Sequence, residues 1–377
     1  MRISEIFKLE VSQIQLDFVD IDTDVDYPLY LDPYLISKRN DPWSIEVDRT
    51  IKSFFSRVRG HIIDKEYDKA KDLFEFMSES KENCFGVSKR GTKNGKGIGK
   101  YNASDIVEEI IKSRAIENET VKNIEDIIVF VDNVDKDKLS DMVTNIIRRH
   151  LIDYTKSQCD IWDIPMKHEE TLPYWNASID DWDSSIEDLL FYEGRELLLV
   201  PKSIVTYISE YNARKYDWDF VINRERDEHL RRMSSLVKFK KYKSGKEIAR
   251  LPKKDVFEYI NDKIKKDEFV NKKDYLRQYT QKHPELFEKF RESTSNKVKS
   301  LTNQDFMEYT GNIDIGRLID DLIDNLKRIP YGIKNASQYH KFVKCILEML
   351  FYPFLTNPTI EEKLHQGRKR VDIVMNN

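Results

Sequence analysis

Cysteine is scarce in this chain of 377 residues, and long apolar runs are absent from it. The three cysteines, Cys84, Cys159 and Cys345, are odd in number, lie far apart and form no CxxC pair. This pattern argues against a disulfide framework and against a zinc site. No apolar stretch approaches the length of a transmembrane helix, and residues 1–5 do not open a signal peptide. We therefore expect a cytoplasmic protein with reduced thiols.

The sequence also lacks an excess of charge of one sign, because 63 Lys and Arg residues stand against 67 Asp and Glu, a net charge of −4. This balance gives no global signature of nucleic-acid binding, so any basic binding site must be local. Apolar residues make up 40% of the chain and charged residues 34%, which is typical of a folded, charge-rich protein. The length is sufficient for two or three domains.

Residues 1–160 are predicted to form an N-terminal α/β domain. Alternation of apolar and polar residues predicts a strand over Ile14–Asp22, and Leu29–Leu31 predicts a second, short strand. Apolar residues at helical spacing after Asp41-Pro42 predict a helix over Trp43–Arg59.

A second long helix is predicted over Met142–Tyr154, with Ser140 as its N-cap. The apolar run Ile124–Val131 precedes it and suits either a buried strand or a buried helical turn. The polar face of the long helix, which includes Arg148 and Arg149, is expected to be structural rather than a contact surface.

Five aspartates cluster near the N-terminus at alternating spacing: Asp17, Asp20, Asp22, Asp24 and Asp26. Carboxylates are the oxygen ligands that Mg²⁺ and Ca²⁺ prefer, but the spacing and glycine pattern of an EF-hand are absent. Two interpretations stay open, a solvated acidic strand edge and a cation site, and the first is favoured.

A glycine-rich basic stretch runs from Gly86 to Lys100, with the basic residues Lys89, Arg90, Lys93, Lys96 and Lys100. Backbone amides in glycine-rich turns, flanked by Lys and Arg, suit phosphate oxygens. A helix predicted over Asp105–Ile116 would place a helix N-terminus close by. The stretch does not match a Walker A loop. It is therefore either a phosphate or nucleic-acid contact or a basic loop with no dedicated ligand.

Residues 161–205 are predicted to be a connecting segment, because Trp162–Trp182 shows no periodicity; a buried strand is expected over Arg195–Pro201. Residues 206–330 are predicted to be a charged helical region. Within it, Arg224–Lys254 carries twelve Lys or Arg residues against four acids, with aromatic residues interleaved. This stretch either follows a phosphate backbone or is a solvated, charged arm without a ligand. Later helices are expected around Val256–Ile264, Tyr275–Tyr279 and Leu286–Phe290.

The last segment, residues 331–377, begins with a predicted helix from about Ser337. Tyr339, Phe342, Val343, Ile346, Leu347 and Leu350 form one apolar stripe on this helix. Glu348 lies roughly opposite the stripe, beside Cys345, Met349, Phe351 and Tyr352. Burying a carboxylate costs free energy unless a cation or a hydrogen-bond donor offsets it. Glu348 is therefore a candidate site residue.

A hairpin is predicted after this helix, with a strand over Thr359–Leu364, a turn over His365–Arg368 and a second strand over Arg370–Met375. On the second strand, Asp372 points away from its apolar neighbours, a position typical of a Mg²⁺ ligand. The alternative without a functional site is a C-terminal α+β segment in which Asp372 forms an ion pair with a neighbouring basic residue, Arg370 or Lys369.

Glu348 followed by Gly367-Arg368-Lys369-Arg370-Val371-Asp372-Ile373-Val374 resembles the opening of the PD-(D/E)XK, or restriction-endonuclease-like, nuclease core. Some bacterial proteins of this type, found among phage-defence and mobile-element genes, carry a long N-terminal region. The segments Ile14–Pro33 and Asp126–Cys159 of this chain resemble that region. The resemblance implies that Glu348 and Asp372 are catalytic Mg²⁺ ligands, with Arg368, Lys369 and Arg370 near the phosphate. In that family the next strand supplies a further acid and a lysine. The sequence ends at Asn377 before such a strand, so we expect a truncated core.

The expected fold class is thus α+β and predominantly helical, with an N-terminal α/β region, a charged helical middle and the start of a restriction-endonuclease-like core. The expected function is that of a bacterial defence protein resembling a Mg²⁺-dependent DNA endonuclease, with weak Mg²⁺ binding and no hydrolysis by this chain alone. One alternative is a non-catalytic nucleic-acid-binding or partner-binding protein. Another is a structural subunit whose sheet is completed by a partner protein or a second copy. DNA is the expected partner, and no membrane is expected.

Overall fold

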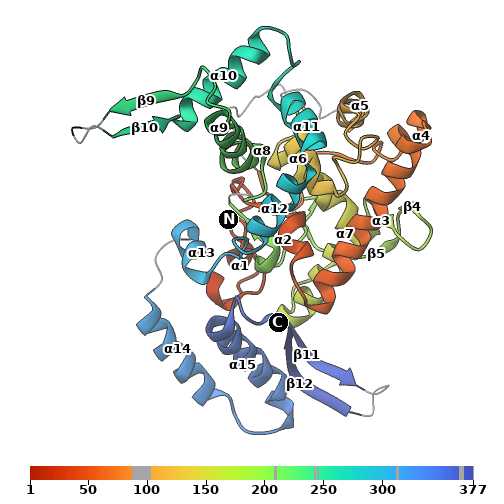
Figure 1. Cartoon of the computed structure of the whole chain (residues 1–377). Helices are drawn as coiled ribbons and strands as arrows, with labels where there is room; N and C mark the ends of the chain where they lie inside the picture. The colour runs from red at the N-terminus through yellow and green to blue at the C-terminus, as the bar shows by residue number, and fades with distance from the viewer. Residues whose placement is uncertain are drawn as a thin grey trace.

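The computed structural model describes residues 1–86, 103–207, 210–241, 243, 246–310, 314–364 and 369–376. The fold is α+β and predominantly helical, as the sequence predicts (Figure 1). Within those residues, the strands pair only into two-stranded antiparallel sheets. One continuous hydrophobic core runs from Ile3 through the N-terminal and middle regions to Phe306 and Tyr352. None of the described helices is long and apolar enough to cross a membrane.

Two long helices, α3 (Pro42–Ile63) and α7 (Lys136–Trp162), pack against each other in the N-terminal region. The predicted start of α3 is confirmed, since the Asp41 carboxylate accepts a hydrogen bond from Ser44 N at 2.9 Å. The remaining elements of this region are α1 (Ile3–Ile6), the 3-10 turn η1 (Gln13–Gln15), β1 (Tyr30–Leu31), α2 (Pro33–Ser37), α4 (Tyr67–Asp72), α5 (Ala103–Ser113), the 3-10 turn η2 (Ile124–Asp126) and α6 (Ile127–Phe130). Of the two interpretations of Ile124–Val131, the buried helical turn is the one observed.

Helix α7 contains the predicted helix but begins earlier, so the prediction of Ser140 as its N-cap is wrong. Asp135 caps the helix by accepting a hydrogen bond from Lys138 N at 3.1 Å. Ser140 lies inside the helix, where its Oγ accepts a hydrogen bond from Leu31 N at 3.0 Å. The Ser140 hydroxyl therefore bonds the backbone of strand β1, and Asp135 provides the cap of the helix.

The strand predicted over Ile14–Asp22 is not observed, whereas the short strand near Leu31 is confirmed as β1. The Gln13 side chain takes the place of a strand partner: its Nε2 donates to Phe18 O at 2.8 Å, and its Oε1 accepts from Asp20 N at 2.7 Å. Residues 14–20 are all buried, so the alternation of apolar and polar residues there does not correspond to a strand with one solvent-exposed face.

The connecting segment consists of short hairpins rather than an irregular loop. Its strands are β2 (Lys167–Glu170), β3 (Tyr174–Asn176), β4 (Asp181–Asp183), β5 (Ile186–Leu189), β6 (Phe191–Tyr192) and β7 (Arg195–Glu196), followed by the 3-10 turn η3 (Lys202–Ile204) and β8 (Val205–Thr206). Trp175 is buried, with its ring 5.2 Å from Phe54 and 6.0 Å from Trp182. Strands of two to four residues are too short to show periodicity. Residues 197–200 are buried as predicted, but outside any strand.

The middle region is helical as predicted, apart from one hairpin. Its elements are α8 (Ala213–Tyr216), the π-helical turn η4 (Asp217–Val221), α9 (Ile222–Arg231), β9 (Lys238–Lys241), β10 (Glu247–Arg250), α10 (Lys253–Lys265), α11 (Lys272–Lys282) and α12 (Pro284–Ser295). The last three helices contain the helices predicted around residues 256–264, 275–279 and 286–290. Aromatic rings of Tyr216, Phe287 and Phe290 pack between α8 and α12, with centroids 5.0–5.7 Å apart.

The C-terminal part begins with α13 (Asn303–Thr310) and α14 (Ile315–Arg328) and continues through the 3-10 turn η5 (Ile333–Asn335). It ends with α15 (Ala336–Phe351) and the hairpin of β11 (Thr356–Leu364) and β12 (Lys369–Asn376), so the predicted helix and both predicted strands are confirmed. Helix α14 lies beside α15, and the hairpin extends from the end of α15 away from the rest of the chain (Figure 1).

Candidate nuclease-like site and nucleic-acid interface

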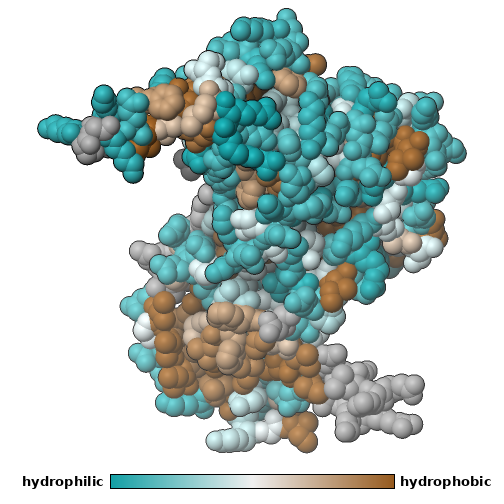
Figure 2. Space-filling model, viewed as in Figure 1, coloured by the Kyte–Doolittle hydropathy of each residue, from teal (hydrophilic) through white to brown (hydrophobic). Residues whose placement is uncertain are grey.

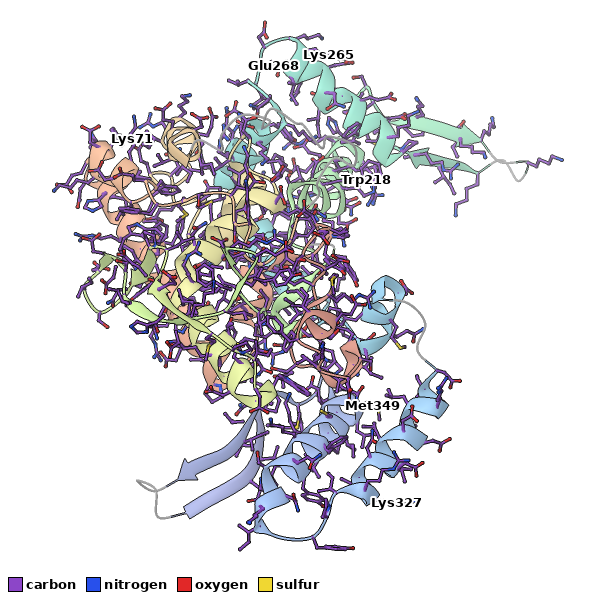
Figure 3. The ribbon with its side chains drawn as sticks, turned by 180° about the vertical axis from the view of Figure 1, so that it is seen from behind. Lys71, Trp218, Lys265, Glu268, Lys327 and Met349 are labelled. Atoms are coloured by element: carbon purple, nitrogen blue, oxygen red, sulfur yellow. The ribbon has the colours of Figure 1, made fainter. Side chains whose placement is uncertain are left out.

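Helix α15 turns its polar side, not its apolar stripe, toward the rest of the protein. Lys344, Cys345 and Glu348 are buried, whereas Tyr339 and Leu350 of the predicted apolar stripe are exposed. The burial of Glu348 agrees with the sequence, but its charged surroundings were not expected. Figure 3 shows the neighbouring Met349 where this helix meets the rest of the chain.

Glu348 forms an ion pair with Lys202 of η3, with Lys202 Nζ 3.0 Å from Glu348 Oε1. Neither side chain has exposed surface. Lys202 Nζ also lies 3.4 Å from Asn303 Oδ1 and 4.1 Å from the centre of the Tyr352 ring. Within the described part of the chain, neither Glu348 oxygen accepts a hydrogen bond of good geometry. The attraction between the two charges therefore offsets part of the cost of their burial.

A second carboxylate, Asp17, and a second ammonium group, Lys344, are also buried and interact electrostatically with this pair, giving a buried ionic cluster of Asp17, Lys202, Lys344 and Glu348. Asp17 Oδ2 accepts a hydrogen bond from the Tyr154 hydroxyl at 2.7 Å. Lys344 Nζ lies 5.3 Å from the centre of the Trp162 ring, and it makes no hydrogen bond with the described residues. The cluster contains two groups of each sign.

The cluster also changes proton affinities. Burial raises the pKa of Glu348 to about 7, although the nearby Lys202 ammonium opposes that rise. Burial lowers the pKa of Lys202, while Glu348 and Asp17 oppose that fall. Both shifts follow from removing a charged group from water.

Asp372 lies apart from this cluster. Its side chain on β12 is 77% exposed, and its Oδ2 lies 3.9 Å from His340 Nε2. His340 precedes Glu348 by eight residues on the same helix, which corresponds to about 12 Å along the axis. The structure therefore does not bring Glu348 and Asp372 together around one position, and in this arrangement the two carboxylates do not fit a shared Mg²⁺ ion. Among the described residues, no three His, Cys, Asp or Glu side chains converge as metal ligands.

Most of the predicted nucleic-acid-binding residues lie outside the part of the chain that the structure describes. These are Lys89, Arg90, Lys93, Lys96, Lys100 and Arg368. Lys369 and Arg370 open strand β12, where they pair with Leu364 and Lys363 of β11. The possibility that this group contacts phosphate stays a prediction.

Of the five N-terminal aspartates, Asp17 and Asp20 are buried, whereas Asp24 and Asp26 are exposed. Asp20 accepts hydrogen bonds from Ser4 N at 2.9 Å and from Ser4 Oγ at 2.6 Å. Asp22 and Asp24 lie 2.7 and 2.8 Å from the Met1 ammonium group. The favoured interpretation of a solvated acidic edge is therefore wrong for Asp17 and Asp20, which are buried.

A basic hairpin, and not a helix, forms within the charged stretch of the middle region. Within Arg224–Lys254, expected to be helical, strands β9 and β10 pair in the register Lys238↔Arg250, Lys240↔Ile248. Residues 238–250, which we call the basic arm, contain six Lys or Arg residues and one acid, Glu247. The arm projects from the body beyond α9 and α10 (Figure 1). The alternation of Lys238, Phe239 and Lys240, followed by the dipeptide Ser244-Gly245, whose composition is typical of turns, is the sequence signal that could have predicted it.

The arm presents its side chains to solvent on both faces. Every described residue of β9 is exposed, and Phe239 keeps 61% of its surface exposed. Lys238 Nζ lies 2.7 Å from Asp255 Oδ2 and ties the base of the arm to α10. Trp218, labelled in Figure 3, lies near the base of the arm and contacts Lys253, whose Nζ is 5.6 Å from its ring centre.

Comparisons with known proteins leave the C-terminal site and the basic arm without a counterpart. No curated protein and no solved structure matches this chain. One family model does match, and it covers residues 8–212, which include Asp17 and Lys202 of the buried ionic cluster but neither Glu348 nor Asp372. Because that model spans more than half of the sequence, the chain belongs to the family described as a domain of unknown function, DUF8370.

Proposed function

We propose that this protein binds double-stranded DNA through the basic arm. The observation that carries the proposal is the projection of a two-stranded, solvent-exposed ribbon with six basic residues and one acid. A two-stranded ribbon fits the major groove of B-DNA, which is about 12 Å wide.

The strand register places most of the positive charge of the paired strands on one face of the arm. Side chains alternate along a strand, so Lys238 and Lys240 share one face with Arg250, whereas Lys241 lies on the other face, directly opposite Glu247. Basic side chains gathered on one face of a ribbon suit contacts with the phosphate backbones that flank the major groove. Recognition of this kind is electrostatic and is expected to depend strongly on salt.

The test is to measure the affinity for a DNA duplex as a function of salt concentration. A variant with Lys240→Gln, Lys241→Gln and Lys243→Gln removes three exposed cations of the arm. We expect it to bind more weakly and to reduce the slope of log K against log salt by about 2–3, since each phosphate contact contributes about 0.9.

The matched control removes three exposed cations elsewhere: Lys282→Gln, Lys289→Gln and Lys297→Gln on and after α11 and α12. This variant has the same net charge, so it separates a local contact from a general electrostatic effect. An equal loss in both variants, or an unchanged slope in the arm variant, would contradict the proposal.

We infer, as a second candidate, that α15, β11 and β12 are the beginning of a restriction-endonuclease-like core in a bacterial defence protein. The support is a helix carrying a buried acid, followed by an antiparallel hairpin with Asp372 on its second strand. Incubating plasmid DNA with the protein and Mg²⁺ tests hydrolysis. We expect no cleavage while Glu348 is paired with Lys202. Cleavage by the natural sequence that is lost in the Asp372→Asn variant would show that the protein is an active nuclease.

A further inference from the structure

A polar hollow of about 430 Å³ opens between α2, α3 and α12, beside the turn η2. Its volume lies in the range of small-molecule sites. Every side chain that lines it has a polar group. Figure 2 shows a mainly hydrophilic surface over α2 and α12, in contrast to the brown, apolar surface over α14 and α15. The hollow therefore suits a polar ligand rather than an apolar one.

Glu125 of η2 is the most deeply buried charged group that lines this hollow. It keeps only 8% of its surface exposed, and the side chain of Arg291 keeps 17%. The side chains of Lys52 and Glu288 keep 59% and 54% exposed, so they lie at the rim. Water and salt screen charges at the rim much more than a charge at the floor. The floor is therefore dominated by Glu125 and Arg291.

The guanidinium group of Arg291 is already paired with other residues. Its Nη2 lies 2.5 Å from Oδ2 of the buried Asp126, and its Nη1 lies 3.6 Å from Glu288 Oε1. Its Nε donates a hydrogen bond to the Tyr211 hydroxyl at 3.1 Å. Within the described part of the chain, no cation lies at ion-pairing distance from the Glu125 carboxylate, and no other residue donates a hydrogen bond to it. Glu125 is thus a buried acid without a partner.

A carboxylate in this position costs free energy unless it is protonated or a cation offsets its charge. Burial raises the pKa of Glu125, the neighbouring Asp126 carboxylate raises it further, and Arg291 opposes the rise. Without a ligand, the surroundings of Glu125 therefore favour its protonated form. A cation in the hollow would favour the carboxylate form, so binding of a cation would release a proton.

An organic cation fits this position better than a metal ion. Among the residues that the structure describes, no three His, Cys, Asp or Glu side chains converge as metal ligands. The hydroxyl groups of Tyr34, Ser37 and Ser295 also line the hollow, and each hydroxyl oxygen can accept a hydrogen bond. Ammonium and guanidinium groups carry several N–H donors, so they can bond a carboxylate and hydroxyl groups together.

The surrounding charge favours a cation over an anion. The charged groups around Glu125 come from every neighbouring element: Asp32 and Lys38 cap α2, Lys52 lies on α3, Asp126 lies in η2, and Glu288, Arg291 and Glu292 lie on α12. With Glu125 ionised, five acids stand against three bases. Lys38 is placed over the Tyr34 ring, with its Nζ 4.9 Å from the ring centre.

We propose that this hollow binds a small organic cation, one with an ammonium or guanidinium group, and that the Glu125 carboxylate is its counter-charge. The probe is methylguanidinium, because a guanidinium group stays charged at all pH values used for proteins. Methylurea is the control ligand, since it has nearly the same shape but no charge. Ligand-observed NMR titrations of the full chain measure both affinities, and we expect methylguanidinium to bind and methylurea not to bind.

Two variants locate the site. Glu125→Gln should weaken the binding of methylguanidinium by at least about tenfold, because it removes a charged hydrogen-bond acceptor. The matched control Glu292→Gln removes the same charge from an exposed position of the same hollow and should weaken binding by less than about threefold. Circular dichroism verifies that both variants are folded. An equal loss in the two variants, or no loss in Glu125→Gln, would overturn the proposal.

The pH dependence tests Glu125 in the natural sequence, without any substitution. Affinity for methylguanidinium should rise as pH increases through the raised pKa of Glu125, because the protonated carboxyl must lose its proton to bind a cation. Glu125→Gln should abolish this dependence. Failure of the natural chain to bind methylguanidinium, equal binding of methylurea, or an affinity that does not change with pH would each contradict the assignment of Glu125 as the counter-charge.

Discussion

Lys202 Nζ lies 3.0 Å from Glu348 Oε1, and both side chains are fully buried. Lys202 belongs to the segment that the DUF8370 family model matches, whereas Glu348 lies on the C-terminal helix α15 outside it. This buried ion pair therefore joins the DUF8370 domain to helix α15. The neighbouring contact from Asn357 N to Asp17 Oδ1, at 3.3 Å, joins the same two parts through the hairpin.

We expect Lys202→Met to destabilise the protein by about 3–5 kcal/mol, because it leaves the Glu348 carboxylate buried without its closest counter-charge. The measurement is the free energy of unfolding in urea. The double variant Lys202→Met, Glu348→Met should recover most of the loss, since an apolar pair of similar volume often replaces a buried ion pair at little cost.

An exposed ion pair provides the comparison. Lys52 and Asp48 lie 2.5 Å apart on the surface of α3, and Lys52→Met should change the free energy of unfolding by less than about 1 kcal/mol. If Lys202→Met had an effect as small as this, the pair would contribute little to holding α15 in place.

The sequence was sufficient to predict that Glu348 is buried but not to predict its partner. Its apolar neighbours Cys345 and Tyr352 indicated burial, which depends only on local periodicity. Lys202 is distant in sequence, and no motif or spacing relates the two positions. A buried carboxylate needs a counter-charge, but its chemistry does not distinguish a metal ion from a lysine ammonium.

Asp32 makes stability depend on pH in a defined window. Burial raises its pKa from 3.8 to about 6, although its carboxylate caps α2 by accepting hydrogen bonds from Tyr34 N and Leu35 N. Between these two pKa values the folded state binds more protons than the unfolded state. Stability contributed by the protonated carboxyl is therefore lost as pH rises from about 4 to 6, on the order of 2–3 kcal/mol.

Asp32→Asn tests this dependence, because asparagine keeps an oxygen for the helix cap but does not titrate. The variant should gain stability relative to the natural protein as pH rises from 4 to 6, and the difference should stay constant above 6. Urea unfolding at several pH values measures it. The exposed carboxylate of Asp68 serves as the control, and Asp68→Asn should show no such trend. A difference independent of pH would contradict the raised pKa.

The fold was predictable where the sequence of a single helix or hairpin contains the residues that determine its structure. The Asp41-Pro42 start of α3 and the hairpin β11–β12 are confirmed because caps, turn residues and periodicity are local. The strand predicted over Ile14–Asp22 failed because the Gln13 side chain bonds the backbone there, a contact that no pattern reveals. The strands of the connecting segment pair through tertiary packing around Trp175, which also leaves no local period.

Substitution of Phe239 distinguishes binding of duplex DNA by the basic arm from binding of single strands. Its ring is 61% exposed, so Phe239→Ala should change the free energy of unfolding by less than about 0.5 kcal/mol. Base stacking on an aromatic ring contributes about 1–3 kcal/mol but requires unpaired bases. In the proposed duplex complex the bases stay paired, so we expect the affinity for duplex DNA to fall by less than about threefold. Fluorescence anisotropy measures it, and a larger loss would instead indicate stacking on unpaired bases.

Mg²⁺ is expected to have little effect on stability, because Glu348 is paired with Lys202 and Asp372 lies apart on the exposed hairpin. Thermal unfolding with and without millimolar Mg²⁺ should give Tm values within about 1 °C. Glu348→Gln should lower Tm under both conditions, since it removes the charge that faces Lys202, whereas Asp372→Asn should leave Tm unchanged. A rise in Tm with Mg²⁺ that either substitution abolished would show instead that the two carboxylates bind one ion, which would require α15 to release Glu348 from Lys202.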